Sequence, residues 1–487
     1  MAAKKRADVL LHIDERANTP LYLQIYGQVR EAIFTGTLAA GDRLTSIRRL
    51  SSELGVSHTT VEQAYLQLAT EGLVANVPRS GYVVSDVDAD FITLVRDIDS
   101  NALANERGAR DRNAFYAENR SGGEARYDFS YANLQPGSFP ANAWRKLTSD
   151  VLYRADCPEL ARYSYTDEPG SLHIELASLL SRTRGVNCLP DQILTQAGTD
   201  GALSTVLQLF DRDCDVLGME EPGYATVREV AKRLGFRIAA LPADKGTDAF
   251  LSALEKHKPR VVFTTPSHQF PTGKLLSLDG RTKLLKWAET NGSYIIEDDS
   301  CNEFRYSTRP IPSLQSLDVF DRVIYLCNVS KVLSPALRIA YLVLPPELLA
   351  RYWSLFNYAH PPVSWLDQEV LARFMASGQW DAHVRRTAKG NHRRHDELLR
   401  CLRASFGDSI VISGTNTGMH LYVSVQNGMT QEELLDSAAR EGAKVYGTAR
   451  MWFSRRAPEE NVMIGFSAIA HDDIEPGVAA LARAWRR

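Results

Sequence analysis

The sequence predicts two domains: a small N-terminal domain of three helices and a β-hairpin, then a larger α/β domain with a mainly parallel sheet. Its 487 residues exceed what one hydrophobic core usually serves. Short amphipathic helices and a hairpin pattern fill residues 18–86, and apolar strands alternate with helical stretches through residues 126–487. Residues 87–125 hold 5 Lys/Arg against 8 Asp/Glu and include Ser-Gly-Gly, which predicts a linker.

Composition narrows the protein class. Hydrophobic residues at 44% and charged residues at 24% exclude a disordered or fibrous chain. Because the sequence has neither a long uncharged apolar run nor a signal-peptide pattern, we expect a cytoplasmic protein without a membrane partner. The six cysteines form no C-x-x-C pair, so neither a metal site nor a disulfide framework is predicted. A net charge of −3 means that any nucleic-acid contact comes from a local surface.

Three N-terminal helices are predicted from apolar side chains at helical spacing. The positions expected to face inward are Leu21, Ile25, Val29, Ala32 and Ile33 in the first helix, Ile47, Leu50 and Leu54 in the second, and Val61, Ala64, Tyr65 and Leu68 in the third. Gly72 ends the third helix, and LVANVPRSGYVV then has the pattern of two short strands around a turn. This order predicts a winged helix-turn-helix.

In such a domain the third helix enters the major groove, and its polar first turn reaches base edges. Arginines before it and at the wing tip are suited to clamping phosphates. The predicted DNA contacts are Arg43, Ser46, Arg48, Ser57, His58, Thr59, Thr60, Arg79 and Gly81. The alternative is a structural or protein-binding module without DNA affinity.

The stretch from Thr19 to Val84 resembles the GntR-family winged helix. The family pattern L-P-S-x-R becomes Leu-Thr-Ser-Ile-Arg, which keeps Ser46 and Arg48, and V-S-R-x-T-V becomes Val-Ser-His-Thr-Thr-Val. His58 stands where the family usually has arginine, so different base contacts are expected.

Strands of the second domain end in polar residues, and ligands of parallel α/β sheets collect at those ends. GTDGALSTVLQLF places Gly198 and its neighbours at a helix start, where an anion is favoured. SYIIEDDS ends in three carboxylates, at least one of which is expected to face the crevice and could pair with a pyridinium-type cation. RVIYLCNVSK ends at Lys331, seven residues before Arg338, so this lysine is a candidate for Schiff-base formation.

Residues 126–487 resemble fold-type I aminotransferases that use pyridoxal 5′-phosphate (PLP), and TPSHQFPTG and EEPGY are similar to MocR-type regulators. The resemblance implies a mainly parallel sheet flanked by helices and a smaller C-terminal α+β subdomain. The resemblance implies that Lys331 forms the Schiff base with PLP, that Asp298 pairs with the pyridine nitrogen, and that Tyr224 stacks on the ring. It assigns the phosphate to Thr199, Asp200, Asn328, Ser330 and Arg338. Tyr165 resembles the tyrosine that reaches the cofactor of the partner subunit, which implies a domain-swapped homodimer.

Three positions depart from the family pattern. Ser300 replaces a tyrosine near the cofactor, Met463 replaces the arginine that holds a substrate carboxylate, and Thr226 replaces an arginine found in some regulators. A carboxylate would therefore need another cation, such as Arg228 or Arg450, or would find none.

Loss of the clamp favours a sensor over an enzyme, because rapid transamination requires an oriented substrate. We expect a PLP-dependent regulator that binds double-stranded operator DNA and senses a small amino compound. Three effectors stay open: an amine or amino acid, an amino compound with another acidic group such as a sulfonate, and PLP itself. The alternative is an active PLP-dependent aminotransferase with an autoregulatory DNA-binding domain.

Overall fold

The computed structural model divides the chain into two compact units, Met1–Ser121 and Gly122–Arg487. It describes residues 11–14, 19–78, 81–86, 125–131, 133–153, 158–161, 163, 169–212, 215–307, 311–357 and 359–486. All but the last residue of the predicted linker lies outside this description. None of the helices described has the length and apolar character needed to cross a bilayer.

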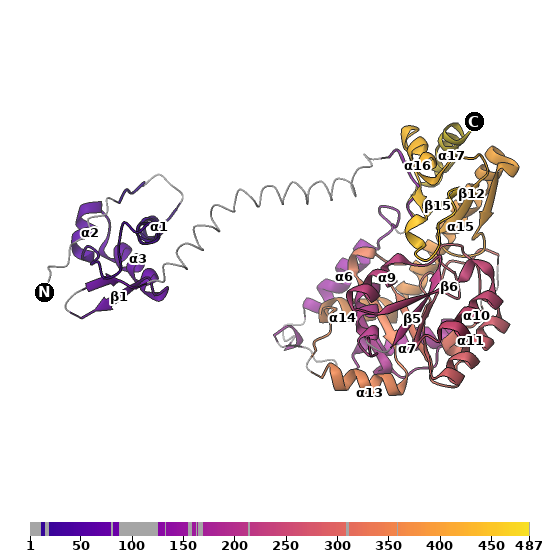
Figure 1. Ribbon diagram of the computed structural model, residues 1–487, viewed down its shortest axis with the longest axis horizontal. Helices are drawn as coiled ribbons and strands as arrows, with labels where there is room; N and C mark the ends of the chain where they lie inside the picture. Colours follow the sequence, from indigo (N-terminus) through magenta and orange to yellow (C-terminus); the bar gives the residue numbers. More distant parts are fainter. Residues whose placement is uncertain are drawn as a thin grey trace. The chain divides into compact units, whose positions relative to one another are not determined.

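The N-terminal unit is a winged helix-turn-helix, as predicted (Figure 1). Its elements are α1 Leu21–Phe34, α2 Ile47–Leu54, α3 His58–Thr70, β1 Val74–Val77 and β2 Gly81–Val84. The residues expected to face inward on α3 are all buried, and Leu50 of α2 joins them. Strands β1 and β2 pair antiparallel as the wing, with Val77 opposite Gly81. The expected fold class of this unit is confirmed.

A seven-stranded sheet forms the centre of the second unit, in the order β4-β10-β9-β8-β7-β5-β6. The strands are β4 Ile193–Ala197, β5 Val216–Glu221, β6 Arg237–Pro242, β7 Val261–Thr264, β8 Tyr294–Asp298, β9 Val323–Asn328 and β10 Ile339–Val343. All neighbours are parallel except β10, which runs antiparallel to β4 and β9. The mainly parallel sheet predicted from the sequence is therefore confirmed.

Helices cover both faces of this sheet (Figure 1). They are α6 Ala141–Leu152, α7 Ser171–Arg184, α8 Gly198–Leu207, α9 Ala225–Arg233, α10 Thr247–His257, α11 Leu278–Asn291, α12 Leu314–Leu317, α13 Pro346–Leu355 and α14 Trp365–Ala376. Successive strand residues point to opposite faces, so Ile296 and Leu326 join one core cluster whereas Ile295 and Tyr325 join two others. The strands are buried on both faces, which explains their continuous apolar runs.

A smaller antiparallel sheet follows, in the order β11-β12-β15-β14. Its strands are β11 Ile410–Ser413, β12 His420–Val425, β14 Tyr446–Gly447 and β15 Asn461–Gly465, accompanied by α15 Gln379–Phe406, α16 Gln431–Arg440 and α17 His471–Trp485. Short strands β3 Tyr127–Asp128 and β13 Ala443–Lys444 pair in parallel nearby. Short 3₁₀ turns are Pro158–Ala161, Pro190–Gln192, Ala243–Lys245, Pro335–Leu337, Gly407–Ser409 and Ala449–Met451. This is the predicted α+β subdomain.

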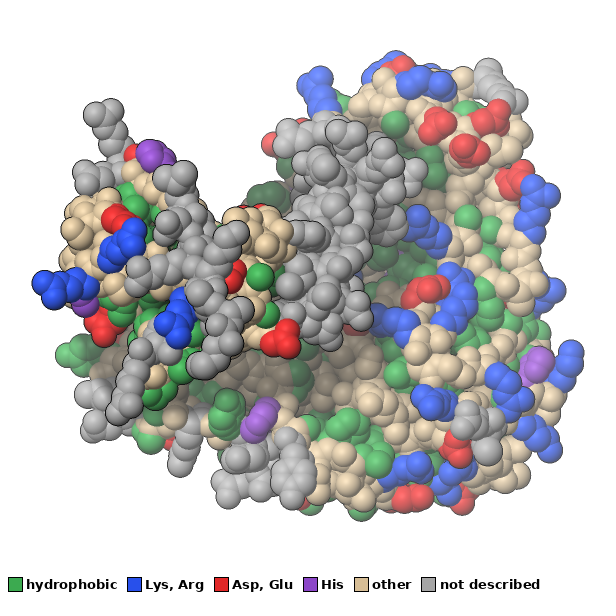
Figure 2. All heavy atoms as spheres, turned by 60° about the vertical axis from the view of Figure 1, so that its left-hand side comes forward, with side chains coloured by type: hydrophobic (Ala, Val, Ile, Leu, Met, Phe, Trp, Pro, Cys, Tyr) green, Lys and Arg blue, Asp and Glu red, His purple; other side chains and the backbone are tan. Residues whose placement is uncertain are grey.

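Basic and acidic side chains are interspersed over the visible face of the molecule (Figure 2).

Candidate functional site

A cavity of about 120 Å³ lies beside the carboxyl ends of β8 and β9. Its lining comes from residues far apart in the sequence: Tyr131, Thr199, Tyr224, Thr265, His268, Phe270, Asp298, Ser300, Cys301, Asn328, Lys331 and His420. Five of the predicted site residues, Thr199, Tyr224, Asp298, Asn328 and Lys331, are thus brought together. The cavity lies where ligands of parallel sheets are expected.

The three carboxylates that end SYIIEDDS have different surroundings. Glu297 is fully buried, accepts hydrogen bonds from the amides of Leu314 and Gln315, and lies 3.6 Å from Arg281. Asp298 lines the cavity. Burial raises the pKa of Asp298, and its Oδ1 accepts a hydrogen bond from the Ser300 amide at 3.0 Å.

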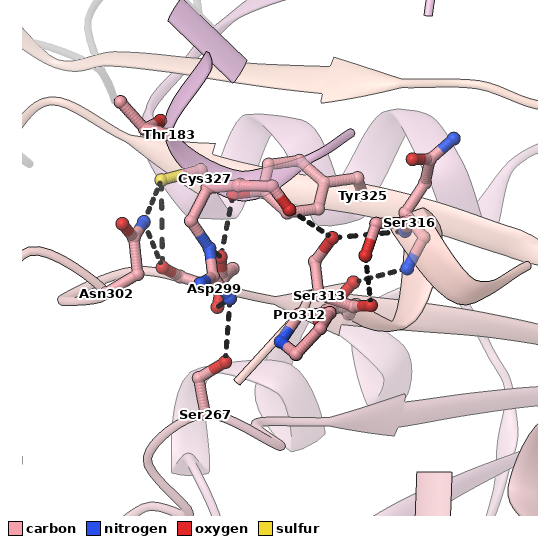
Figure 3. Close-up of polar contacts among 12 residues, drawn as sticks. Thr183, Ser267, Asp299, Asn302, Pro312, Ser313, Ser316, Tyr325 and Cys327 are labelled. Carbon is pink, nitrogen blue, oxygen red and sulfur yellow. Dashed lines mark hydrogen bonds and ion pairs between the residues drawn. The ribbon is translucent and has the colours of Figure 1, made fainter. Parts of the chain in front are cut away.

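Asp299 is fully buried and belongs to a network of polar contacts (Figure 3). Its Oδ2 accepts from Arg184 Nε at 2.5 Å and from the Tyr325 hydroxyl at 2.8 Å, while Oδ1 accepts from Arg184 Nη2 at 3.1 Å. Arg184 also donates to Ser267 Oγ at 3.2 Å. Because each oxygen of Asp299 is engaged, only Asp298 is available to a ligand.

Lys331 follows β9, and its ammonium lies 5.6 Å from the centre of the Tyr131 ring. Asn328, the last residue of β9, donates to Ser300 Oγ at 2.8 Å and to Thr199 Oγ1 at 3.3 Å. Ser300 therefore holds Asn328 at the cavity wall. A serine is long enough for this contact, although it is shorter than the tyrosine usual at that position.

The start of α8 forms a cradle for an anion. Gly198 has φ of +73°, and a Cβ at this residue would collide with the guanidinium of Arg338. That guanidinium therefore lies over the helix N-terminus, where free amides and the helix dipole favour negative charge. Asp200 and Arg338 are exposed and Ser330 is half-buried, and none of the three belongs to the cavity lining.

Two buried histidines at the cavity were not predicted as site residues. His268 Nδ1 lies 2.8 Å from Thr417 Oγ1, and His420 Nε2 lies 2.8 Å from the carbonyl of Pro271. Burial lowers the pKa of His268 to about 3 and that of His420 to about 4, so both rings are neutral near pH 7. His268 stands in TPSHQFPTG, which the resemblance had singled out, whereas no local signal marks His420.

Aromatic rings close the cavity around these histidines. Tyr131 lies 5.5 Å from Phe270 and 5.7 Å from His420, measured between ring centres. Tyr224, the N-cap residue of α9, meets Phe270 edge-on at 5.6 Å. Burial raises the pKa of Tyr131 to about 12. Tyr131 was not predicted either, because it lies far from the strand ends in sequence.

The described residues that line the cavity include no arginine. This agrees with the departures from the family pattern at Met463 and Thr226. Met463 is buried inside β15, in a cluster with Met451 and Trp452. Arg228 donates to the carbonyl of Trp452 at 3.3 Å, and Arg450 is exposed in a 3₁₀ turn. Neither arginine that the sequence offered as a substitute clamp lines the cavity.

Four of the predicted DNA contacts, Ser57, His58, Thr59 and Thr60, lie at the start of α3. Ser57 caps this helix by accepting from the Thr60 amide at 3.1 Å, and its hydroxyl also lies 2.7 Å from Thr60 Oγ1. Ser46 caps α2 in the same way, through the Arg49 amide. These hydroxyls therefore support the helix starts. Side chains of Arg43, Arg48, His58 and Thr59 are exposed.

Gly81 begins β2 with φ of +76°, and the space beside its Cα is open. A binding partner can therefore approach the backbone of Gly81 closely. Two predicted residues, Arg79 and Tyr165, lie outside the described part of the chain.

Comparison with known proteins identifies both units. Residues 21–84 match the model of bacterial regulatory proteins of the gntR family, and residues 129–481 match aminotransferase class I and II. The multiple substrate aminotransferase of Thermococcus profundus superposes with a TM-score of 0.67, at 23% identity, over 74% of this chain and 92% of that structure. This likeness concerns the fold of the second unit.

Full-length relatives combine the two units in the same order. The chain is 32% identical to the uncharacterized HTH-type transcriptional regulator YdeL of Bacillus subtilis (strain 168), over 98% of this chain and 100% of that protein. It is 29% identical to the probable rhizopine catabolism regulatory protein MocR of Rhizobium meliloti, over 98% of this chain and 96% of that protein. The chain therefore belongs to the MocR-type transcriptional regulators, DNA-binding proteins of the GntR family that carry an aminotransferase-like domain.

Proposed function

We propose that the aminotransferase-like domain holds PLP in the cavity and senses a small amino compound, and that this event changes the affinity of a homodimer for its operator. The observation that carries the proposal is the meeting of Lys331 and Asp298 in one cavity beside the cradle at Gly198. A primary amine, a buried carboxylate and an anion cradle are the three groups that PLP requires.

The residues present fit this cofactor. Asp298 is 9% exposed and forms no ion pair among the described residues, although Lys331 lies near enough to lower its pKa. A protonated ring nitrogen would therefore offset the unfavourable burial of its charge. The guanidinium of Arg338 lies so close to Gly198 that a Cβ there would collide with it, so this cation lies beside the free amides at the start of α8. This pairing supports the binding of a phosphate dianion there. The chemistry of the donor set therefore agrees with PLP.

Each residue has a distinct role in this arrangement. When bound, PLP supplies an aldehyde that condenses with primary amines and a ring that withdraws electrons. Lys331 would provide the primary amine that holds the cofactor, and an effector amine would compete with it for the same position. Asp298 would keep a proton on the ring nitrogen, and Tyr224 would cover the ring. Arg338 and the start of α8, with Thr199 and Asn328, would hold the phosphate.

The regulatory step requires two arrangements of the dimer that the effector binds unequally. The resemblance assigns Tyr165, which lies outside the described residues, to the cofactor phosphate of the partner subunit. Arg43, Arg48 and Arg79 would contact DNA phosphates, with His58 and Thr59 facing base edges. An effector that changes the spacing of the two winged helices then changes operator affinity.

Sensing is favoured over turnover because the described cavity lining offers no arginine to orient a carboxylate. Transamination remains the competing function, since the fold is that of aminotransferases. Steady-state turnover of an amino donor and a keto-acid acceptor above about 1 per second, within the ordinary enzyme range, would contradict the sensor role.

The decisive experiment compares wild type with Lys331→Ala, using Lys286→Ala on the exposed face of α11 as the control. Full-length protein is incubated with PLP, gel-filtered, reduced with borohydride and mapped by proteolysis. We expect the pyridoxyl group on Lys331 in wild type and in the control, and complete loss of visible absorbance in Lys331→Ala. Colourless wild-type protein with unmodified Lys331 would refute the proposed function.

A further inference from the structure

A second cavity in this unit, of about 990 Å³, is lined mainly by α15 and by residues 134–143. It shares no lining residue with the cavity at Lys331. Its volume is at the upper end of the range of about 300–1,000 Å³ that is usual for small-molecule sites. The described lining contains two arginines, Arg386 and Arg394, and no acidic residue. An excess of positive charge in a concave site favours an anionic ligand.

The face of α15 at the second cavity has no side chain between its two arginines. Arg386, Gly390 and Arg394 are four residues apart and therefore lie on one side of the helix. A Cβ at Gly390 would lie 3.7 Å from the guanidinium of Arg394, which is an ordinary contact. Packing therefore does not require glycine, although glycine inside a helix costs stability relative to other residues. Its effect is to leave room for a ligand beside both guanidinium groups.

Arg394 is a half-buried cation that is held by neutral groups. It donates to the carbonyl of Phe466 at 2.9 Å, to Gln135 Oε1 at 3.0 Å and to Asn391 Oδ1 at 2.5 Å. These bonds fix the guanidinium and leave part of its five N–H donors free. Burial lowers the pKa of Arg394, and neither Arg394 nor Arg386 forms an ion pair in the described part of the chain. An anion would offset this cost of burial and accept from the remaining donors.

The start of α6 borders the same cavity. Pro140 precedes this helix as its N-cap, and no described side chain caps it. Asn142 and Ala143, in the first turn, line the cavity. Amides of a first turn lack intrahelical partners, and the helix dipole favours negative charge beside them. Phe139 and Phe374 add aromatic surface to the lining, so an apolar group can bind beside the charged one.

We propose that the second cavity is a binding site for a small organic anion. The acid groups of the ligand, phosphate or carboxylate, bind Arg386 and Arg394, and its apolar part lies against Phe139 and Phe374. This site goes beyond the proposed function, because the second cavity and the cavity at Lys331 have no lining residue in common and can be occupied at the same time.

The test measures ligand binding to PLP-loaded, gel-filtered full-length protein by isothermal titration calorimetry at physiological salt. ADP and glutarate carry the two kinds of acid group, and adenosine is the uncharged control. We expect at least one of the two acids to bind with a Kd below about 1 mM, whereas adenosine does not bind. The visible absorbance of the cofactor should stay unchanged. Protein that does not acquire PLP would contradict the proposed function, and the same titrations on that protein would still test the second cavity.

Adjacent arginines on α15 supply matched variants. Arg386→Gln removes a lining arginine, and Arg385→Gln removes the same charge from the neighbouring exposed residue, which does not line the cavity. We expect the first to weaken binding at least about fivefold, through loss of a charge-assisted hydrogen bond, and the second less than about twofold. Gly390→Leu keeps both arginines and fills the space between them, so binding should be lost. This variant should fold, because leucine is a better helix former than glycine.

Each contrary result overturns the proposed site. Absence of binding by both acids would show that the second cavity is not an anion site. An equal loss of affinity in Arg385→Gln and Arg386→Gln would show general attraction to a basic helix instead of contact. Binding that persists in Gly390→Leu would place the ligand elsewhere, and an acid that abolishes the cofactor absorbance would place it in the cavity at Lys331. Equal binding of adenosine and ADP would remove the role of charge.

Discussion

The two candidate binding regions of this chain are built in opposite ways. The DNA-binding region consists of neighbouring residues on α2, α3 and the wing, and side chains such as Arg48 and His58 are exposed. The cavity collects side chains from residue 131 to residue 420, several of them buried. The DNA-binding region is made of residues close together in sequence and exposed to water. The cavity is made of residues far apart in sequence, and several of them are buried.

This difference decides how strongly each polar group affects the fold. Water solvates an exposed arginine whether or not DNA is present, so its replacement costs little stability. A buried carboxylate either pairs with a cation or keeps part of the free-energy cost of losing its hydration. Asp299 shows the first solution and Asp298 the second, although they are adjacent residues at the end of β8. Asp298, the carboxylate without a cationic partner, is the one that lines the cavity.

Replacement of Arg184 should have the largest effect. Arg184→Met leaves Asp299 buried and without its cationic partner, because the Arg184 side chain is only 2% exposed and lies 2.5 Å from the carboxylate. We expect a loss of about 3–5 kcal/mol in the free energy of unfolding. All seven tryptophans lie between Trp144 and Trp485, so denaturant titration followed by tryptophan fluorescence reports this unit alone.

Arg182→Met on the same helix is the matched control. Its side chain is 58% exposed and pairs with Asp381 at 2.8 Å, so a loss below about 1 kcal/mol is expected. Similar losses in both variants would contradict the contrast between buried and solvated charges.

Asp298→Asn should stabilise the cofactor-free protein, by less than Arg184→Met destabilises it. Burial raises the pKa of Asp298, so the folded state holds its proton more tightly than the unfolded state and the ionised group destabilises the fold above that pKa. We expect the variant to melt at a higher temperature than wild type at about pH 8, because asparagine has no charge to bury. The gain should vanish as the pH falls below the ordinary pKa of aspartate.

The same substitution should impair retention of PLP, since the ring nitrogen loses its carboxylate. Asp299→Asn is the adjacent control and should lower the melting temperature at about pH 8, because it removes the partner of Arg184. A stabilised Asp299→Asn or a destabilised Asp298→Asn would reverse the roles assigned to these two residues.

The N-terminal unit was predictable from sequence because its determinants are local. Helical spacing identified Val61, Ala64, Tyr65 and Leu68 as core, and all four are buried. The cap formed by Ser57 is local as well, since a capping hydroxyl acts within one helical turn. What the sequence could not show is that this hydroxyl also bonds Thr60 and is therefore partly occupied.

In the second unit, the sequence predicted which residues end the strands, but it did not predict which of these residues face the cavity. Parallel-sheet logic indicated that one carboxylate of SYIIEDDS would face a crevice, but only the packing of Arg184 against Asp299 distinguishes the candidates. His420 and Tyr131 reach the cavity from another subdomain and from the segment after β3. Such contacts depend on tertiary packing, for which one sequence contains no periodic signal.

Arg48→Ala should have the smallest effect and tests the solvated side of the comparison. Arg48 is exposed on α2, so its loss should leave the unfolding free energy and the cofactor absorbance unchanged. Operator affinity should fall about threefold at physiological salt, and the slope of log affinity against log salt should decrease by about 0.9, as for one lost phosphate contact. Arg403→Ala, exposed on α15, should change neither quantity. An unchanged salt slope in Arg48→Ala would remove this arginine from the DNA interface, and a changed cofactor spectrum would show that the two regions are not energetically separate.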